Sequence, residues 1–303
     1  MSETGAPAFT VVVVTYNSAH VVGKLLDSLP AAVDHVPVET IVVDNGSADG
    51  TADLVEARGD CVVVRSTNVG YAAGINRGYE AGRGTGPILI LNPDVRLQPG
   101  SVTRMAEALR RPSAGIVAPR VVNADGSLQF SLRREPTLAR AIGLTFTRVP
   151  VLSEYCNRPD DYRSAHVVDW ALGAVMLVRR ECFAALDGWD ASYFLYSEET
   201  DFCLRARALG WQTWYEPSAV VEHAGRESGY NKEIHAMQIV NRIRFYRRRH
   251  GVVCSTLYWL LAICSEGYRA LLGSRIHQHS VLTLVRPSSR PPEIGCSHQL
   301  LPR

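Results

Sequence analysis

The first ninety residues alternate between continuous apolar runs and stretches with helical spacing. Runs without polar alternation are typical of strands buried on both faces, and they occupy residues 9–14, 40–43, 61–65 and 87–91. The intervening stretches place apolar side chains on one helical face, as at Val22, Leu25 and Leu29. Repeated strand–helix units predict an α/β fold with a mostly parallel sheet.

Capping and stop signals divide these stretches further. We expect Asn17 or Ser18 to cap the first helix and Pro30 to lie at its end, with later helices over 51–58 and 76–81. The second half predicts strands at 167–170 and 174–179, helices at 181–186 and 198–210, and a strand at 211–215 ended by Pro217. A basic helix is expected over 237–250, and the last twenty residues or so, rich in Pro, Ser and His, predict disorder.

Polar clusters follow three of the predicted strands. In parallel sheets ligands bind outside the carboxyl ends of the strands, so polar residues that directly follow these ends are candidates for a shared site. The clusters comprise Thr15, Tyr16, Asn17, Asp44, Asn45, Asn92 and Asp94.

Composition narrows the functional classes. The 303 residues are 46% hydrophobic, which argues against a largely disordered or collagen-like chain. The formal net charge of +2 implies no strong polyelectrolyte partner, and we expect no nucleic-acid binding. None of the seven cysteines forms a CxxC pair, so reduced thiols and a cytoplasmic location are the simplest account. The apolar stretch 252–264 is shorter than the ~20 residues of a membrane-spanning helix, so it predicts a core or interfacial helix.

The segment around Asp44 carries the most specific local signal. A carboxylate at a strand end can accept a hydrogen bond from a base or a ribose hydroxyl, although a turn followed by a helix cap would use the same residues. The chain has neither a Gly-x-Gly-x-x-Gly fingerprint nor a Walker Gly-Lys-Ser/Thr, which disfavours dehydrogenases and P-loop enzymes.

Two further acidic segments suggest chemistry. Asp94 could bind a divalent cation that bridges a diphosphate, since Mg²⁺ uses few protein carboxylates; the alternative is an Asx-Pro turn. Glu198, Glu199 and Asp201 begin a predicted helix, where their mutual repulsion favours a raised pKa in one of them. The alternative is that these acids only complement the helix dipole.

Read in order, the motifs resemble those of family 2 glycosyltransferases with the GT-A fold, and most of all bacterial rhamnosyltransferase-type members. The resemblance covers about residues 8–250. It rests on Thr-Tyr-Asn at 15–17, Val-Asp-Asn-Gly-Ser-x-Asp-Gly-Thr at 43–51, Asn-Val-Gly-Tyr at 68–71, Gly-Ile-Asn-Arg-Gly at 74–78, Leu-Asn-Pro-Asp-Val at 91–95, Ser-Glu-Glu-Thr-Asp-Phe-Cys-Leu-Arg at 197–205 and a late His223.

The resemblance implies roles for these positions. Glu199 would be the general base, with Glu198 beside it on the acceptor side, although the family often has Asp at the base position. Asp94 would hold Mg²⁺ or Mn²⁺ where the family has Asp-x-Asp, and His223 could complete the metal site or be structural. The nucleotide-sugar would contact Thr15, Tyr16, Asn17, Asp44, Asn45, Asn68, Asn76, Asn92 and Asp94.

Trp170 and Gly173 match the family's acceptor-side segment, where Trp170 would offer a stacking face and Gly173 would let a sugar approach the backbone; a core Trp beside a bulge is the alternative. The resemblance implies a GT-A domain over 8–235. The pattern of the residues that follow predicts a basic and apolar helical segment over 236–280 and a disordered tail over 281–303.

Five arginines without an intervening acid precede the apolar stretch. A basic helix beside an apolar one suits peripheral contact with an anionic membrane on its cytoplasmic face; a solvated basic face is the alternative. The arginines are Arg242, Arg244, Arg247, Arg248 and Arg249.

The sequence therefore predicts an inverting, metal-dependent transfer of a sugar from a dTDP- or UDP-sugar to a hydroxyl of a glycan or polyprenyl-linked acceptor. Family likeness alone favours dTDP-rhamnose as donor. A nucleotide-sugar-binding module without transfer activity is the alternative; a nucleotidyltransferase lacks its early Gly-rich basic loop. A homodimer is left open.

Overall fold

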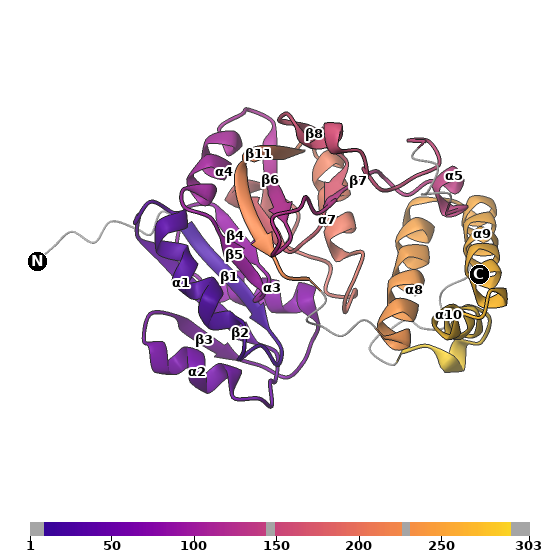
Figure 1. Ribbon diagram of the computed structural model, residues 1–303, viewed down its shortest axis with the longest axis horizontal. Helices are drawn as coiled ribbons and strands as arrows, with labels where there is room; N and C mark the ends of the chain where they lie inside the picture. Colours follow the sequence, from indigo (N-terminus) through magenta and orange to yellow (C-terminus); the bar gives the residue numbers. More distant parts are fainter. Residues whose placement is uncertain (1–8, 144–148, 226–230, 292–303) are drawn as a thin grey trace, which may run out of the picture.

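The parallel half of the central sheet follows the apolar runs of the sequence. The computed structural model describes residues 9–143, 149–225 and 231–291. Its strands β1 (Phe9–Thr15), β2 (Val38–Asp44), β3 (Val62–Arg65) and β4 (Ile88–Leu91) pair in parallel in the order β3-β2-β1-β4. Their carboxyl ends therefore lie along one edge (Figure 1).

The other half of the sheet mixes directions. β10 (Val175–Val178) runs antiparallel between β4 and β6 (Ala114–Val122). β11 (Gln212–His223) runs parallel to β6 and antiparallel to β5 (Val95–Leu97) and β8 (His166–Val168). A separate ribbon pairs β7 (Leu132–Arg133) with β9 (Trp170–Ala171). The α/β architecture with a mostly parallel central sheet is confirmed.

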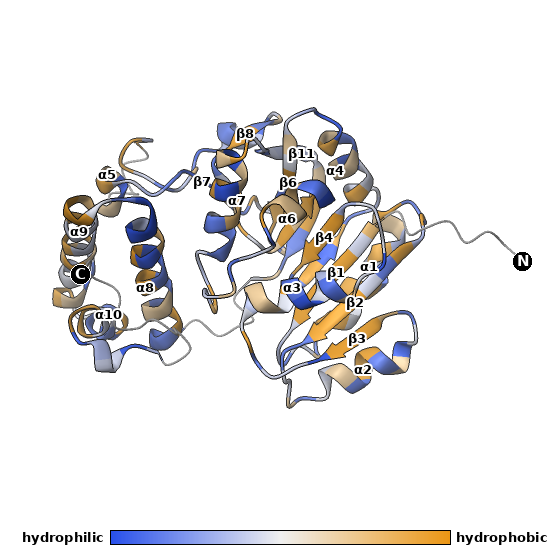
Figure 2. Ribbon diagram, turned by 180° about the vertical axis from the view of Figure 1, so that it is seen from behind, coloured by the Kyte–Doolittle hydropathy of each residue, from blue (hydrophilic) through white to orange (hydrophobic). Residues whose placement is uncertain are grey.

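Helices cover both faces of the sheet. One core cluster joins it to α1 (Val22–Ala32), α2 (Thr51–Arg58) and α4 (Ser101–Leu109). A second core, which contains Ile75, Phe183 and Phe202, joins it to α3 (Tyr71–Ala81), α6 (Arg180–Ala185) and α7 (Glu198–Ala208). The strands between these layers are strongly hydrophobic (Figure 2).

The C-terminal helices form their own unit beside the sheet (Figure 1). α8 (Lys232–Arg249), α9 (Val252–Leu271) and α10 (Arg275–Val285) enclose a small core that includes Val240, Ile243 and Tyr258, and α5 (Leu138–Ala141) packs against it. Short 3-10 turns lie at Pro159–Tyr162 and Pro287–Ser289. No helix within the described residues combines the length and apolarity needed to cross a membrane.

Several element boundaries differ from the prediction. α1 begins at Val22 without a side-chain cap, whereas Pro30 lies in its last turn, as expected. Pro217 does not end β11, because an irregularity between Glu216 and Val220 leaves the proline without a ladder partner. α3 begins at Tyr71, five residues earlier than expected. Residues 281–285 belong to α10 and not to a tail, and residues 292–303 lie outside the described part.

Candidate functional site

The register of β1 and β2 builds the first part of the site. Thr15 lies opposite Asp44, and its Oγ1 donates to Asp44 Oδ1 over 3.0 Å. The Ser47 backbone N–H donates to Asp44 Oδ2 over 3.0 Å, and the Ser47 hydroxyl donates to Oδ1. Asp44 is 4% exposed, so these bonds hold a nearly buried carboxylate in one orientation at the strand edge.

The loops after β1 and β2 are joined to each other. Asn17 adopts a left-handed backbone (φ 51°), its N–H donates to Ser47 Oγ, and its Oδ1 accepts from the Ala48 N–H over 2.8 Å. Asn17 therefore ties the two loops together and does not cap α1. Tyr16, which lies between Thr15 and Asn17 in the chain, is 56% exposed.

The loop before α3 packs closely on the site. Asn45 Nδ2 donates to the Gly70 carbonyl over 3.0 Å, while its buried Oδ1 has no hydrogen-bond partner. Asn68 Oδ1 accepts from the Gly70 N–H over 3.2 Å. Gly70 has φ 89°, and a Cβ there would lie 2.5 Å from the Phe194 carbonyl oxygen, so this approach requires glycine. Asn45 thus keeps one buried acceptor for a donor at the strand edge.

Asn76 has a different role from the one expected. Its Nδ2 donates to the Trp189 carbonyl over 2.8 Å and its Oδ1 accepts from the Trp189 N–H over 2.9 Å. These bonds fasten α3 to the loop after α6. The two glycines of the same motif, Gly74 and Gly78, lie against Val14 and Val12 of β1. This motif therefore serves helix–sheet packing.

The turn after β4 forms a second corner with the end of β11. Asp94 Oδ1 lies 3.4 Å from His223 Nε2, and His223 Nδ1 lies 3.1 Å from Gln129 Oε1. The two ring nitrogens of His223 therefore face Gln129 on one side and Asp94 on the other, which fixes the orientation of the imidazole. Asn92 anchors the turn through its N–H, which donates to the Ala174 carbonyl over 2.8 Å.

Electrostatics keep Asp94 ionised. Burial opposes its charge, but the His223 side chain and backbone N–H groups, including that of Gly225, outweigh burial and lower the pKa of Asp94. Asp94 thus offers a carboxylate oxygen and His223 an imidazole nitrogen, and both side chains are nearly buried and held in place by neighbouring groups. This pair of ligands suits a divalent cation whose other ligands come from a diphosphate.

The first turn of α7 buries two carboxyl groups. Glu198 is 3% and Glu199 9% exposed, and Oε2 of each has no hydrogen-bond partner. Burial raises the pKa of Glu199 to about 7, against the opposing charge of Arg133. Burial and then the neighbouring Glu199 raise the pKa of Glu198 well above its usual value. Asp201 is instead paired with Arg205 and Arg249. The two adjacent buried carboxyl groups thus both have raised pKa values, and the pair can exchange a proton near neutral pH.

Strained backbone precedes these carboxyl groups. Tyr196 (φ 68°) and Ser197 (φ 74°) are consecutive non-glycine residues in the left-handed region, and Ser197 makes no side-chain cap bond to α7. Such conformations cost on the order of 1 kcal/mol or more each and persist where surrounding structure imposes them. Here they set the direction in which α7 leaves the loop.

Tyr71, Gly173 and Trp170 connect the parts of the site. The Tyr71 hydroxyl donates to the Gly173 carbonyl over 3.0 Å, and burial followed by the charges of Glu198, Glu199 and Asp94 raises the pKa of Tyr71. Tyr71 is thus close to both acidic corners; it belongs to a quoted motif, but sequence reasoning gave it no role.

Gly173 has a packing role at the site. A Cβ at Gly173 would lie 3.3 Å from Glu199 Cβ, so the glycine makes room for the Glu199 side chain. Trp170 Nε1 donates to the Arg134 carbonyl over 3.0 Å, and the Trp170 indole is 7% exposed. The indole is therefore fixed in orientation beside the small β7–β9 ribbon.

Glu199 opens onto a cavity of about 330 Å³. Glu199, Trp170 and Arg133 line one part of it, and residues of α8, α9 and α10, such as Ile239, Ala262 and His277, line another. The cavity therefore extends from the sheet edge to the C-terminal helices. Arg133 stacks on Tyr155, with Cζ 4.0 Å from the ring centre, and was missed because its neighbours on β7 carry no recognisable motif.

The basic helix is not a free cationic face, contrary to that expectation. Arg242 bonds Glu154 and the Tyr258 hydroxyl, and Arg244 bonds Asn241 and the Ser192 carbonyl. Arg248 pairs with Asp190 and Arg249 with Asp201. Because the partners of these arginines lie mainly in the α/β domain and its loops, the charges of α8 dock the helical unit.

The chain is similar to known glycosyltransferases along most of its length. Residues 10–169 match the family model described as glycosyl transferase family 2. An N-acetylglucosaminyl-diphospho-decaprenol L-rhamnosyltransferase of Mycobacterium tuberculosis is 34% identical over 244 residues, 74% of this chain and 79% of the relative.

Solved structures support the fold. A mannosyltransferase from Pyrobaculum calidifontis, in complex with GDP-Man and Mn²⁺, superimposes with a TM-score of 0.57 at 18% identity, over 98% of this chain and 85% of that one. Staphylococcus aureus TarS 1–349, in complex with UDP-GlcNAc, gives 0.57 at 16% identity, over 94% and 82%. With its GT-A fold and the family motifs at its sheet edge, the chain is a sugar-transferring enzyme that belongs to glycosyl transferase family 2.

Proposed function

We propose that this enzyme moves rhamnose, with inversion, from dTDP-rhamnose to a hydroxyl of a polyprenyl-diphosphate-linked N-acetylglucosamine. The observation that carries the proposal is the placement of an ionised Asp94 beside His223 at one corner and a carboxyl group of pKa about 7 at the other, both near Tyr71. The transferred sugar and the acceptor follow the name of the mycobacterial relative, and the dTDP carrier follows the family resemblance of the sequence.

The donor would lie across the strand ends. Asp44 and the unpartnered Asn45 Oδ1 would accept hydrogen bonds from the base and ribose. Asp94 and His223 would hold Mg²⁺ or Mn²⁺, and that cation would stabilise negative charge on the departing diphosphate. Asn92 would keep the metal-binding turn in place through its backbone bond to Ala174.

The acceptor would occupy the cavity beside Glu199. A hydroxyl attacking C1 from the face opposite the diphosphate must lose a proton, and Glu199 would take it as the general base. Trp170 and Arg133 would line the sugar site. The attack needs no covalent enzyme intermediate, so the product would have the opposite anomeric configuration to the donor.

Peripheral membrane contact would bring the lipid-linked acceptor to this cavity. Because four of the five arginines of α8 are bonded to other residues of the chain, we place the contact on α9, where exposed apolar residues recur at steps of three or four. They are Val253 (81% exposed), Leu257, Leu260, Cys264, Tyr268 and Leu271 (89%). Arg275 and Arg286, which are exposed at the two ends of α10, would meet anionic headgroups on the cytoplasmic face.

A donor screen tests the proposal. Release of nucleoside diphosphate is measured with dTDP-rhamnose and with UDP- and GDP-sugars, with and without a short-chain polyprenyl-diphosphate N-acetylglucosamine, and with and without EDTA. We expect release only with dTDP-rhamnose plus acceptor and only with a divalent cation, and NMR should show an inverted anomeric centre. Donor binding without turnover would instead favour the inactive nucleotide-sugar-binding module.

A further inference from the structure

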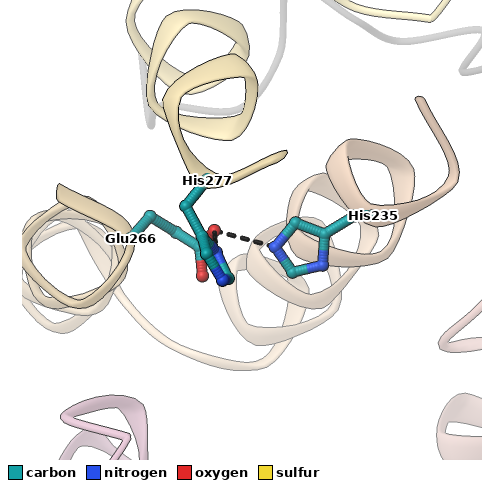
Figure 3. A group of neighbouring side chains, drawn as sticks. All are labelled: His235, Glu266 and His277. Atoms are coloured by element: carbon teal, nitrogen blue, oxygen red, sulfur yellow. Dashed lines mark hydrogen bonds and ion pairs between the residues drawn. The ribbon is translucent and has the colours of Figure 1, made fainter. Parts of the chain in front are cut away.

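Three helices of the C-terminal unit direct one side chain each to a common point. His235 comes from α8, Glu266 from α9 and His277 from α10 (Figure 3). His235 Nε2 and His277 Nδ1 each lie 2.8 Å from Glu266 Oε2. The three ligand atoms all lie within 4.8 Å of one another.

Burial and a neighbouring charge hold the three side chains of this cluster in place. The side chains of Glu266 and His235 are 3% and 8% exposed, and that of His277 is 21% exposed. The other carboxylate oxygen, Oε1, faces the Arg269 guanidinium at 3.5 Å. Arg269 therefore leaves Oε2 as the atom directed at the two imidazoles. All three side chains also line the cavity that extends to Glu199.

We propose that His235, Glu266 and His277 bind a divalent transition metal of the zinc class, at a site separate from Asp94 and His223. Two imidazole nitrogens and one carboxylate oxygen form a donor set that zinc prefers. Zinc bonds these ligands at about 2.0–2.2 Å, which places tetrahedral ligands about 3.3 Å apart. The two 2.8 Å contacts would widen by about half an ångström, and the third separation, between the two imidazole nitrogens and within 4.8 Å, would shorten toward that spacing.

The open cavity supplies the fourth position. Three protein ligands leave one coordination place, and the cavity side of the cluster admits a water or an oxygen of a bound molecule. The metal would also join α8, α9 and α10, whose shared core is small, so binding would stabilise this unit. The alternative is a triad held by hydrogen bonds alone.

Metal binding by the tag-free full chain tests the site. The protein is stripped with chelator, and Zn²⁺ binding is measured by competition with a chromophoric chelator and by thermal unfolding. Co²⁺ is added in parallel, since its visible spectrum reports coordination geometry and ligand type. We expect one tight Zn²⁺ per chain, a rise in unfolding temperature with Zn²⁺, and a tetrahedral Co²⁺ spectrum.

Matched variants assign the binding to these residues. Glu266→Gln and His277→Ala should each weaken Zn²⁺ binding by at least about 100-fold, whereas His279→Ala on the same helix and Asp94→Asn at the other site should leave it unchanged. Wild-type protein that binds no Zn²⁺, or variants that keep wild-type affinity, would overturn the proposal. The wild-type titration and Co²⁺ spectrum decide the question even if a variant fails to fold. Because the readout is binding, failure of the proposed sugar transfer leaves this test intact.

Discussion

Among single residues, Glu199 is the one on which the proposed transfer mechanism depends. Its buried carboxyl group has an unpartnered Oε2 and a pKa of about 7, which suits proton abstraction near neutrality. We predict that Glu199→Gln lowers kcat by about 10²–10⁴-fold while the affinity for nucleotide-sugar is retained. Steady-state kinetics and donor titration measure the two effects. Unchanged turnover would remove Glu199 as the base.

The same residue predicts a pH dependence of activity. A general base must be ionised to act, so kcat/KM should rise as the pH increases through about 7 and level off above it. Any activity remaining in Glu199→Gln should lack this rise. A wild-type profile that is flat from pH 6 to 8 would contradict the assignment.

Whereas kcat/KM should rise with pH, the stability of the folded protein should fall. The pKa of Glu199 is raised in the folded state from 4.5 to about 7, so the folded protein binds more protons and loses stability as the pH rises through this interval. We predict that Glu199→Gln is more stable than wild type at pH 8, on the order of 1–3 kcal/mol, and matches it near pH 4. Urea unfolding at both pH values checks this; a less stable variant at pH 8 would contradict the burial argument.

At the scale of elements, glycines decide how α3 meets the sheet. A Cβ on Gly78 would lie 2.4 Å from Val12 Cγ1 of β1, whereas a Cβ on Gly23 of α1 would meet no atom within 4 Å. We predict that Gly78→Ala destabilises the protein by about 1–3 kcal/mol and that Gly23→Ala, the matched control, is neutral or stabilising by up to about 1 kcal/mol. Thermal unfolding measures both. Equal effects would show that α3 is not packed this closely.

The backbone before α7 gives a second test at this scale. Ser197 is left-handed at φ 74° and its side chain makes no cap bond, so glycine would relieve strain without removing a cap hydrogen bond. We predict that Ser197→Gly raises stability by about 1 kcal/mol. Activity should fall if the strain orients Glu198 and Glu199. Lower stability of the variant in thermal unfolding would show that the loop is not strained.

Particular elements show what the sequence can and cannot reveal. The parallel strands were predictable because short continuous apolar runs are typical of strands buried on both faces. The placement of Asp44 and Asp94 at one edge was predictable because the carboxyl ends of parallel strands meet there. Asn76 was not, because its partner is the Trp189 backbone, 113 residues away, and the chain itself carries no sign of that bond. Likewise the arginines of α8 look like a surface charge until Asp201, 48 residues from Arg249, is placed beside them.

At the scale of the whole molecule, the helical unit adds a second surface to the catalytic domain. The exposed apolar face of α9 should bind membranes, so Val253→Ser, Leu257→Ser and Leu260→Ser combined should lower co-sedimentation with phosphatidylglycerol–phosphatidylcholine vesicles several-fold. Leu209→Ser, which alters an exposed leucine after α7, is the matched control. Equal sedimentation of wild type and triple variant would place the membrane contact elsewhere.

The central claim is that the strand ends and the first turn of α7 form one pocket around a cation-bound nucleotide-sugar. A crystal structure with dTDP and Mn²⁺, with data collected at the manganese absorption edge, tests this most directly. The account predicts an anomalous peak between Asp94, His223 and the diphosphate, with the base against Asp44 and Glu199 facing the same pocket. A nucleotide bound elsewhere, or manganese absent from Asp94 in the dTDP complex, would contradict it.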